Sequence, residues 1–359
     1  MFRLVLLFTF IASIAAAQPT NVLFVGNSYT HMNNLFKIYQ NLANSKGKNV
    51  VADTLAVSGS TLYGHTLREN TFRKFKEKNW DYVFIQGFSR ELNKDSLSIA
   101  TYTVPSAQLL IDSIKKYNPC VNIYYYMTWG YADGVKDSIP DDSYSLMQER
   151  IQKGYLQLSK ATGGFPIAPV GMVWKEIREK FPTINLYAPD QAHPSQFGSY
   201  VAACTFYTCI YKESPIDAFF PKKVEDTEAE EIQKTAAAYV LTYYPKYNLD
   251  TIQIPPIDIK PKLDFKINEK WLSISLENKT VGGSKYYWEF GDGKTSTKRN
   301  PKHYYRKSGK YTITLYVKSH CCWYKQKQTI KVSDKIKNGN SPVKPAKPIK
   351  TTKPINPKN

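Results

Sequence analysis

Three residues of this chain have the types and the order needed to attack an acyl group. Ser28 lies in the stretch Asn-Val-Leu-Phe-Val-Gly-Asn-Ser-Tyr-Thr (residues 21–30), where a short apolar run ends in a turn signal. Asp190 and His193 lie far downstream, in Asp-Gln-Ala-His-Pro-Ser. A serine hydroxyl becomes an effective nucleophile when a histidine accepts its proton and a carboxylate orients that histidine. The sequence therefore predicts an acyl-transfer site built from Ser28, His193 and Asp190.

Each of these residues also has an ordinary structural explanation. Ser28 could cap the segment that follows it, and Asp190 could form a turn. His193, which precedes a proline, could be an ordinary loop residue. These alternatives stay open for each residue taken singly, whereas the joint occurrence of all three favours chemistry.

Strands and helices that could position such a site alternate over residues 18–248. Short apolar runs predict strands at residues 22–25, 50–57, 82–85, 121–126 and 167–168. Apolar residues at helical spacing predict helices at residues 33–45, 66–78, 104–117, 142–161, 170–180, 197–211 and 226–243. Strands separated by single helices indicate an α/β fold with a parallel sheet covered on both faces. Such sheets place their chemistry at the carboxyl ends of the strands.

Three short blocks resemble those of the SGNH, or GDSL-type, hydrolases. Gly26-Asn-Ser-Tyr29 follows the first strand, where that superfamily has Gly-Asp-Ser. Ser58-Gly-Ser60 follows the second strand and is similar to the block that supplies a glycine. Asp190-Gln-Ala-His193 is similar to the last block, Asp-x-x-His. The resemblance covers about residues 21–211 and implies a flavodoxin-like three-layer α/β/α sheet and ester hydrolysis.

The resemblance also implies a role for each residue. Ser28 attacks the acyl carbonyl, and His193 takes the serine proton and later returns it to the leaving alcohol. Asp190 holds His193 in the useful tautomer and stabilises its charged form. The backbone amides of Ser28 and Gly59 face the oxyanion, and glycine at the second position lets the backbone approach closely.

The block after the third strand departs from the family pattern. SGNH hydrolases have Gly-x-Asn-Asp there, and the asparagine donates a hydrogen bond to the oxyanion. This chain has Gln86-Gly-Phe-Ser-Arg90 instead. Ser89 aligns with the asparagine, and the side-chain amide of Gln86 is a second candidate donor. We expect one of these two side chains to complete the oxyanion hole.

The loop after the fourth strand contains Met-Thr-Trp-Gly-Tyr (residues 127–131) and must lie at the same sheet edge. Trp129 and Tyr131 are candidates for stacking on a sugar ring, and simple loop packing is the alternative for both. The five histidines are scattered, so the sequence predicts neither a metal site nor a cofactor.

The two ends of the chain suggest export. Residues 1–17 combine Arg3, an apolar core at 4–14 and three alanines at 15–17, which is typical of a secretory signal with a cleavage site. A retained N-terminal anchor is the alternative. No other apolar stretch is long enough for a transmembrane segment. We interpret the five cysteines as small buried residues rather than a disulfide framework: Cys120, Cys204, Cys209, Cys321 and Cys322.

A second domain follows a change in composition. From residue 263 the sequence alternates apolar and polar residues, which predicts a small all-β sandwich. This segment resembles a PKD domain, an immunoglobulin-like sandwich, through Tyr-Trp-Glu-Phe-Gly-Asp-Gly at 287–293 and the residues at 300–305 and 309–315. The predicted division of the chain is a signal peptide (1–17), a catalytic domain (18–250), a linker (251–262), the PKD domain (263–333) and a disordered Lys/Pro-rich tail (334–359).

Lysine carries most of the formal net charge of +19. The basic residues are spread along the chain rather than grouped in a nucleic-acid motif, so we predict no nucleic acid as partner. The sequence leads to a secreted (extracellular, periplasmic or cell-surface) serine esterase that deacetylates an extracellular polysaccharide or glycan. Its basic tail would associate with the cell envelope. Two alternatives remain: a non-catalytic glycan-binding or adhesion protein on a hydrolase fold, and a short-chain lipid esterase.

Overall fold

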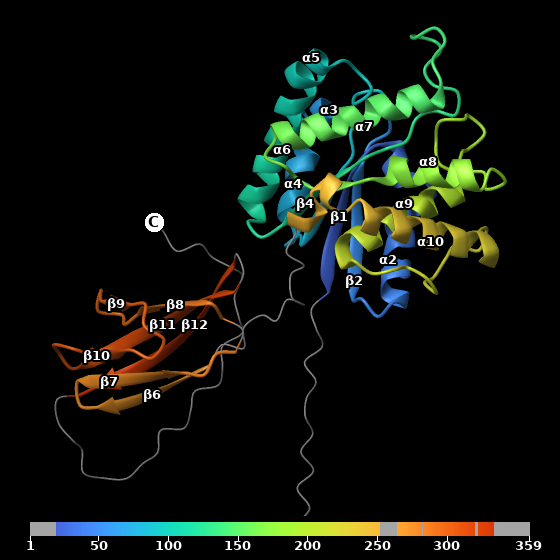
Figure 1. Cartoon of the computed structure of the whole chain (residues 1–359). Coiled ribbons are helices and arrows are strands. Elements are labelled where there is room, and N and C mark those ends of the chain that lie inside the picture. The colour runs from blue at the N-terminus through green and yellow to red at the C-terminus, as the bar shows by residue number, and fades with distance from the viewer. Residues whose placement is uncertain (1–18, 252–263, 282, 320–321, 334–359) are drawn as a thin grey trace, which may run out of the picture.

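Residues 19–251, 264–281, 283–319 and 322–333 are described by a computed structural model of the chain (Figure 1). The predicted signal peptide, almost all of the predicted linker and the predicted tail lie outside these residues. The described residues form an N-terminal unit (19–251) and a C-terminal unit (264–333), and each has a hydrophobic core of its own.

The N-terminal unit is built on one parallel sheet in the order β2-β1-β3-β4-β5. Its strands are β1 (Thr20–Gly26), β2 (Val50–Ala56), β3 (Tyr82–Ile85), β4 (Asn122–Tyr126) and β5 (Ile167–Ala168). This is the flavodoxin-like order, in which the direction of winding reverses between β1 and β3. The predicted α/β fold class is confirmed. Because Ser28 follows β1 and Ser89 follows β3, both lie at this switch point.

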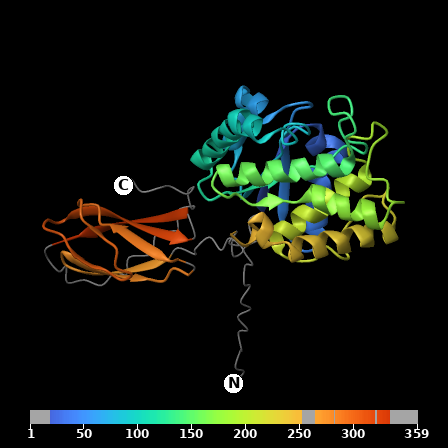
Figure 2. The same ribbon diagram turned by 45° about the horizontal axis from the view of Figure 1, so that its top comes forward.

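Helices cover both faces of the sheet (Figures 1 and 2). The α2, α9 and α10 helices pack together on one face, and α3, α4 and α6 pack together on the other. The longer helices are α2 (Leu35–Ser45), α4 (Glu69–Glu77), α6 (Val104–Tyr117), α7 (Tyr144–Ala161), α8 (Val170–Lys180), α9 (Gln196–Tyr211) and α10 (Asp226–Thr242). The shorter ones are α1 (Ser28–His31), α3 (Leu62–Thr66) and α5 (Ser96–Ser98), with single turns at Met32–Asn34, Ile99–Thr103, Pro245–Tyr247 and Leu249–Thr251.

The α9 helix is buried along nearly its whole length, which fits its apolar sequence on all sides. Phe206 of α9 contacts Phe24 of β1 and Phe84 of β3, with ring centroids 5.0 and 4.6 Å apart. The α2 and α10 helices also pack against α9. The helix that follows His193-Pro194 is therefore held, through Phe206, against the strand that leads to Ser28.

The C-terminal unit is a sandwich of two antiparallel sheets, in the orders β10-β7-β6 and β12-β11-β8-β9. Its strands are β6 (Phe265–Lys270), β7 (Ser273–Asn278), β8 (Lys285–Glu289), β9 (Thr295–Ser296), β10 (Lys302–Tyr304), β11 (Gly309–Ser319) and β12 (Cys322–Val332). Trp288 is fully buried at the centre of the core, beside Phe265. The predicted all-β sandwich is confirmed.

Two local expectations are corrected. The helix predicted over 66–78 begins three residues later, as α4, because the backbone of Arg68 is extended. The separate short helix α3 precedes it and is capped by the Thr61 side chain, which accepts from the Gly64 amide. Cys120 is disulfide-bonded, so it is not the unpaired residue that we expected. Cys204 and Cys209 on α9 are free and buried, as predicted.

In the part of the chain that the structure describes, we find no helix with the length and apolar character needed to cross a bilayer.

Candidate active site

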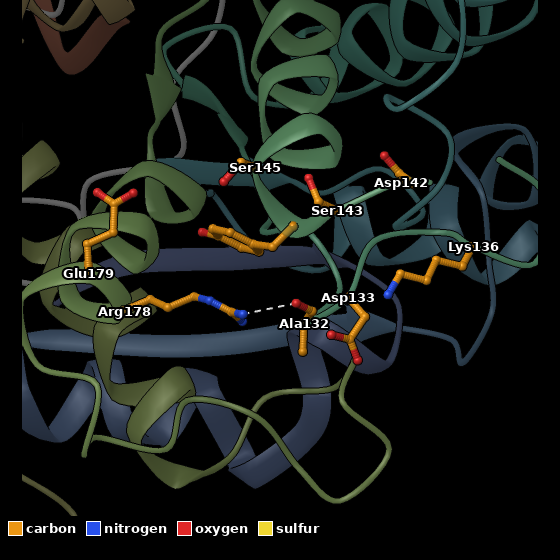
Figure 3. A pocket seen from close by; sticks show the side chains of 9 residues that line it. Ala132, Asp133, Lys136, Asp142, Ser143, Ser145, Arg178 and Glu179 are labelled. Carbon is orange, nitrogen blue, oxygen red and sulfur yellow. Dashed lines mark hydrogen bonds between the residues drawn. The ribbon is translucent and has the colours of Figure 1, made fainter. Parts of the chain in front are cut away.

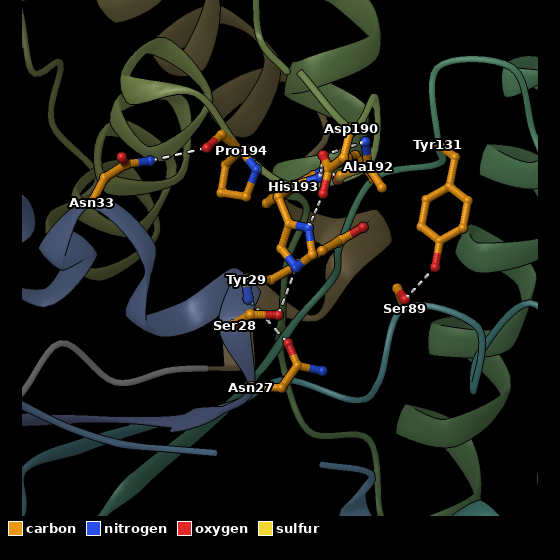
Figure 4. Close-up of polar contacts among 11 residues, drawn as sticks. Asn27, Ser28, Tyr29, Asn33, Ser89, Tyr131, Asp190, Ala192, His193 and Pro194 are labelled. Carbon is orange, nitrogen blue, oxygen red and sulfur yellow. Dashed lines mark hydrogen bonds and ion pairs between the residues drawn. The ribbon is translucent and has the colours of Figure 1, made fainter. Parts of the chain in front are cut away.

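Ser28 is the first residue of a one-turn helix that follows β1 directly (Figure 4). Asn27 caps this helix, and its side-chain oxygen accepts a hydrogen bond from the Tyr29 amide at 3.1 Å. An amide in the first turn of a helix has no acceptor within the helix, which leaves the Ser28 N–H available to an anionic group. The turn thus presents the hydroxyl and the amide of one residue together.

Gln86 fixes this turn from the neighbouring strand and is fully buried. Its side-chain oxygen accepts from the Asn27 amide and the Thr30 hydroxyl, both at 2.9 Å, and its amide nitrogen donates to the Gly87 carbonyl. A Cβ at Gly26 would lie 2.3 Å from the Gln86 oxygen, so only glycine fits there. These contacts contradict the expectation that Gln86 donates to an oxyanion, because its polar atoms are used to hold the turn.

His193 connects the nucleophile turn to the Asp190 carboxylate. The Ser28 hydroxyl oxygen and His193 Nε2 are 2.8 Å apart, and His193 Nδ1 contacts Asp190 Oδ2. With the proton on Nδ1, the ring donates to the carboxylate and accepts from the serine hydroxyl, which is the arrangement that a general base requires. The structure thus brings together the three residues that the sequence singled out (Figure 4).

Asp190 is held in one orientation by its own loop. Its Oδ1 accepts from the backbone amides of Ala192 at 3.1 Å and His193 at 2.9 Å. Partial burial alone would raise the pKa of Asp190, but the hydrogen bonds from the His193 ring and from these amides bring it below its usual value. The carboxylate therefore stays charged through mildly acidic pH.

Trp129 joins the two halves of the site. Its ring stacks on Tyr29 on one side, with centroids 4.7 Å apart, and on Trp174 on the other, at 4.0 Å. Its indole N–H donates to the Ala192 carbonyl at 3.0 Å, and Tyr29 meets the His193 ring edge-on. Trp129 is fully buried and has no free face. This contradicts the expectation that it stacks on a substrate ring; the indole instead holds the loop that carries His193.

Asn33 forms a second connection that the sequence did not reveal. Its side-chain amide donates to the carbonyls of Pro194 and Ser195 and to the Ser199 hydroxyl, at 2.9–3.0 Å. The residue has a left-handed φ of 56°, a conformation that asparagine tolerates better than most residues. The Asn33-Asn34 pair just after the nucleophile was the available signal, because asparagine is common at such positions.

Two buried groups behind the turn were also missed. His65 contacts the Gly26 carbonyl through Nε2 at 2.8 Å, and burial lowers its pKa, so the ring is neutral and donates there. The Glu91 carboxylate accepts from the amides of Phe88 and Leu62, and burial raises its pKa. Both support the loops around Ser28 without facing it, and isolated polar residues of this kind leave no distinctive spacing in the sequence.

Ser89 and Tyr131 lie together near the catalytic residues (Figure 4). Their hydroxyl oxygens are 2.8 Å apart, and Ser89 is buried while Tyr131 is partly exposed. Gly59 lies in an exposed turn with a left-handed φ of 70°, which explains glycine there. Beside it, Ser58 contacts His31 Nε2 at 2.9 Å. Of the two side chains expected to complete the oxyanion hole, Gln86 holds the turn that carries Ser28, whereas Ser89 has its hydrogen bond to Tyr131.

A pocket of about 340 Å³ lies beside the loop that follows Tyr131 (Figure 3). Arg178 crosses it, donates to the Ala132 carbonyl at 2.9 Å and lies over the rings of Tyr144 and Tyr187. Ser28, Asp190 and His193 do not line this pocket. Because Arg178 already donates to the Ala132 carbonyl, we interpret Arg178 as a residue that holds this loop, and we do not assign the reaction to this pocket.

Among the described residues, no group of three or more His, Cys, Asp or Glu side chains could hold a metal ion.

The comparisons with known proteins match the two units separately. A DUF4886 family protein from Bacteroides uniformis superposes with a TM-score of 0.55 at 18% identity, covering 64% of this chain and 96% of that one. A protein from Slackia heliotrinireducens described as a candidate SGNH hydrolase gives 0.42 at 24% identity, covering 53% and 97%. The PKD1 domain of the Vibrio cholerae metalloprotease PrtV gives 0.20 at 35% identity, covering 20% and 96%.

Residues 255–333 match the sequence family described as PKD domain. The solved structures that resemble the N-terminal unit include SGNH- and GDSL-type hydrolases. No curated protein matches the chain. The N-terminal unit therefore shares its α/β fold with the DUF4886 family protein, and the C-terminal unit is a PKD domain.

Changing Trp129→Phe should lower the kcat for a chromogenic acetate ester by ~5–10-fold with KM nearly unchanged, since it removes one hydrogen bond to the His193 loop and keeps a ring in the stack. Trp174→Phe is the matched control, because Trp174 stacks on Trp129 but its indole N–H does not donate to the Ala192 carbonyl. Equal kcat values for the two variants would show that the indole N–H does not position the base.

Changing Ser89→Ala should lower kcat by ~100-fold or more with little effect on KM, because an oxyanion donor acts mainly as negative charge develops. Ser58→Ala is the control, since Ser58 lies on the exposed rim. Steady-state kinetics on the same ester would separate the cases. An unchanged kcat for Ser89→Ala would mean that backbone amides alone form the hole.

Proposed function

We propose that the N-terminal unit is a serine esterase that removes acetyl groups from extracellular carbohydrate. The observation that carries this proposal is the chain of hydrogen bonds from Ser28 through His193 to Asp190, at the carboxyl end of β1 and at the switch point of the sheet. Three residues in hydrogen-bonding order, on a fold that places ligands at this edge, favour acyl transfer over a purely structural role.

In the proposed mechanism, the Ser28 oxygen attacks the ester carbonyl while His193 Nε2 takes the serine proton. The negative charge that develops on the carbonyl oxygen is stabilised by the amides of Ser28 and Gly59 and by the Ser89 hydroxyl. Collapse of the intermediate transfers the proton from His193 to the leaving alcohol and leaves an acetyl group on Ser28. Water then repeats the sequence, with His193 as base, and releases acetate.

The side chains around Ser28 favour a short acyl group and a polar alcohol. Ser89 and Tyr131 present hydroxyls, and the Arg90 guanidinium lies 5.4 Å from the Tyr131 ring centroid. A long acyl chain laid against these hydroxyls would gain no hydrogen bonds from them and would find a less apolar surface than a lipid requires. A sugar can instead contact the partly exposed Tyr131 ring and hydrogen-bond to its surroundings. The short-chain lipid esterase is therefore the second candidate among enzymes.

A non-catalytic glycan-binding protein on the same fold is the candidate from another class. The observation that favours it is the replacement of the family's asparagine, together with the use of Gln86 for structure. Loss of one oxyanion donor lowers the rate by ~10²–10³-fold, so a chain without a substitute would be a weak enzyme. The proposed role of Ser89 decides between these two functions.

The chain organisation that we propose is a secreted protein: a signal peptide, this catalytic domain, the PKD domain and a basic tail that associates with the cell envelope. Export would bring the site to polymeric substrates outside the cell. The segments that carry the export and tail proposals lie outside the described residues, so their support is the sequence pattern alone.

Acetate release from a panel of acetylated polysaccharides, followed with the wild-type protein and with Ser28→Ala, tests this function. We expect Ser28→Ala to lower turnover by at least ~1000-fold while the thermal unfolding curve stays the same. Ser58→Ala should retain activity, because its hydroxyl lies on the rim. Unchanged turnover in Ser28→Ala would remove the proposed nucleophile, and no release by the wild type from any substrate would favour the binding protein.

A further inference from the structure

The three-stranded sheet of the PKD domain, β10-β7-β6, has one face in the core and one in solvent. Ile274 and Leu276 of β7 point into the core, whereas Ser273, Ser275 and Glu277 alternate onto the other face. Paired residues of antiparallel strands share a face, so the register defines what surrounds the serines. We call this outer face the sheet platform.

Two rows of cross-strand neighbours make up the centre of the sheet platform. The first row runs Tyr304, Ser273, Lys270, and the second runs Lys302, Ser275, Asn268. The central residue of each row is a serine, which leaves a low floor between the larger flanking side chains. Tyr304 is 65% exposed and does not belong to the core of the domain.

Trp271 lies in the turn between β6 and β7, directly after Lys270 of the first row. Its ring is 54% exposed, and Lys270 Nζ lies 5.7 Å from the ring centroid. Its φ of 57° is a left-handed conformation, which is unfavourable for a bulky side chain. A hairpin turn with this φ would be more stable with glycine or asparagine. An exposed tryptophan at a strained position adds nothing to the core, so stability does not explain it.

The charge of the domain indicates an anionic partner. Residues 264–333 contain fifteen lysines and arginines against five aspartates and glutamates. On the sheet platform, Lys266, Lys270 and Lys302 flank the serine floor, and Glu277 pairs with Lys266 across the strands. This surface attracts polyanions through its net positive charge.

We propose that the sheet platform binds an acidic polysaccharide, with Trp271 and Tyr304 packing against sugar rings and the lysines pairing with carboxylates. Aromatic rings offer an apolar face of the size of a pyranose, and the serine floor leaves room for the chain to lie flat. The rows of the sheet extend the contact over several sugar units, which suits a polymer rather than a small anion. This site does not depend on the activity of Ser28.

Binding of the full-length protein to immobilised polygalacturonate tests the proposal, with dextran as the neutral polysaccharide. Trp271→Asn keeps a residue that accepts the left-handed turn, and Tyr304→Ala removes the second ring. We expect the double variant to bind at least ~10-fold more weakly, because the two rings add packing contacts with the sugars to the electrostatic attraction of the lysines. Tyr102→Ala, at a 71% exposed tyrosine of the N-terminal unit, and Lys285→Gln, on the opposite sheet, are the matched controls and should bind like the wild type.

Each outcome decides the proposal. Weaker binding of the double variant than of either control, with unchanged thermal unfolding, would support it. Equal binding of the double variant and the controls would reduce the interaction to nonspecific charge and overturn it. Tighter binding to a single-stranded oligonucleotide or to phosphatidylglycerol vesicles, measured in the same assay, would also overturn it in favour of another polyanion.

Discussion

The hydrogen bond between Ser28 and His193 is the contact on which the proposed site of the N-terminal unit depends. The two residues are 165 positions apart in the chain, so the fold must hold their segments together. Two links keep the contact. Trp129 stacks on the residue after the serine and donates to the residue before the histidine, and Asn33 donates to the backbone just after the histidine. Both act on backbone and rings rather than on the reacting atoms. Because hydrogen bonds weaken when their geometry changes by a fraction of an ångström, these links help to maintain the contact between Ser28 and His193.

The same constraint explains the unusual block after β3. Gln86 uses its side-chain oxygen to hold the backbone of Asn27 and the hydroxyl of Thr30, and its own amide nitrogen is bound to Gly87. A side chain so occupied stabilises the turn that carries Ser28. The Ser89 hydroxyl, which lies 2.8 Å from the Tyr131 hydroxyl, is the side-chain donor that we propose for the oxyanion.

The sequence was most informative where the spacing of apolar residues, or one short motif, was enough to define an element or a site. The helix over 104–117 and the strand over 82–85 have the predicted limits, because proline, asparagine and charged residues end apolar runs there. Sequence order also identified Ser28, Asp190 and His193, whose contact the structure contains. It could not identify the role of Gln86 or Trp129, because these depend on which polar atoms meet after folding. An amide and an indole at a sheet edge look alike in sequence whether they face a ligand or the protein itself, and burial is settled only by tertiary packing.

The central claim is that Ser28 is an activated nucleophile, and covalent labelling tests it most directly. The full-length protein would be treated with a fluorophosphonate probe, which reacts with serines activated by a neighbouring base, and analysed by intact-mass measurement and peptide mapping. The account predicts a single adduct on Ser28 that is lost in the His193→Ala variant, because that variant lacks the base. Absence of an adduct, an adduct on another residue, or undiminished labelling of Ser28 in His193→Ala would contradict it.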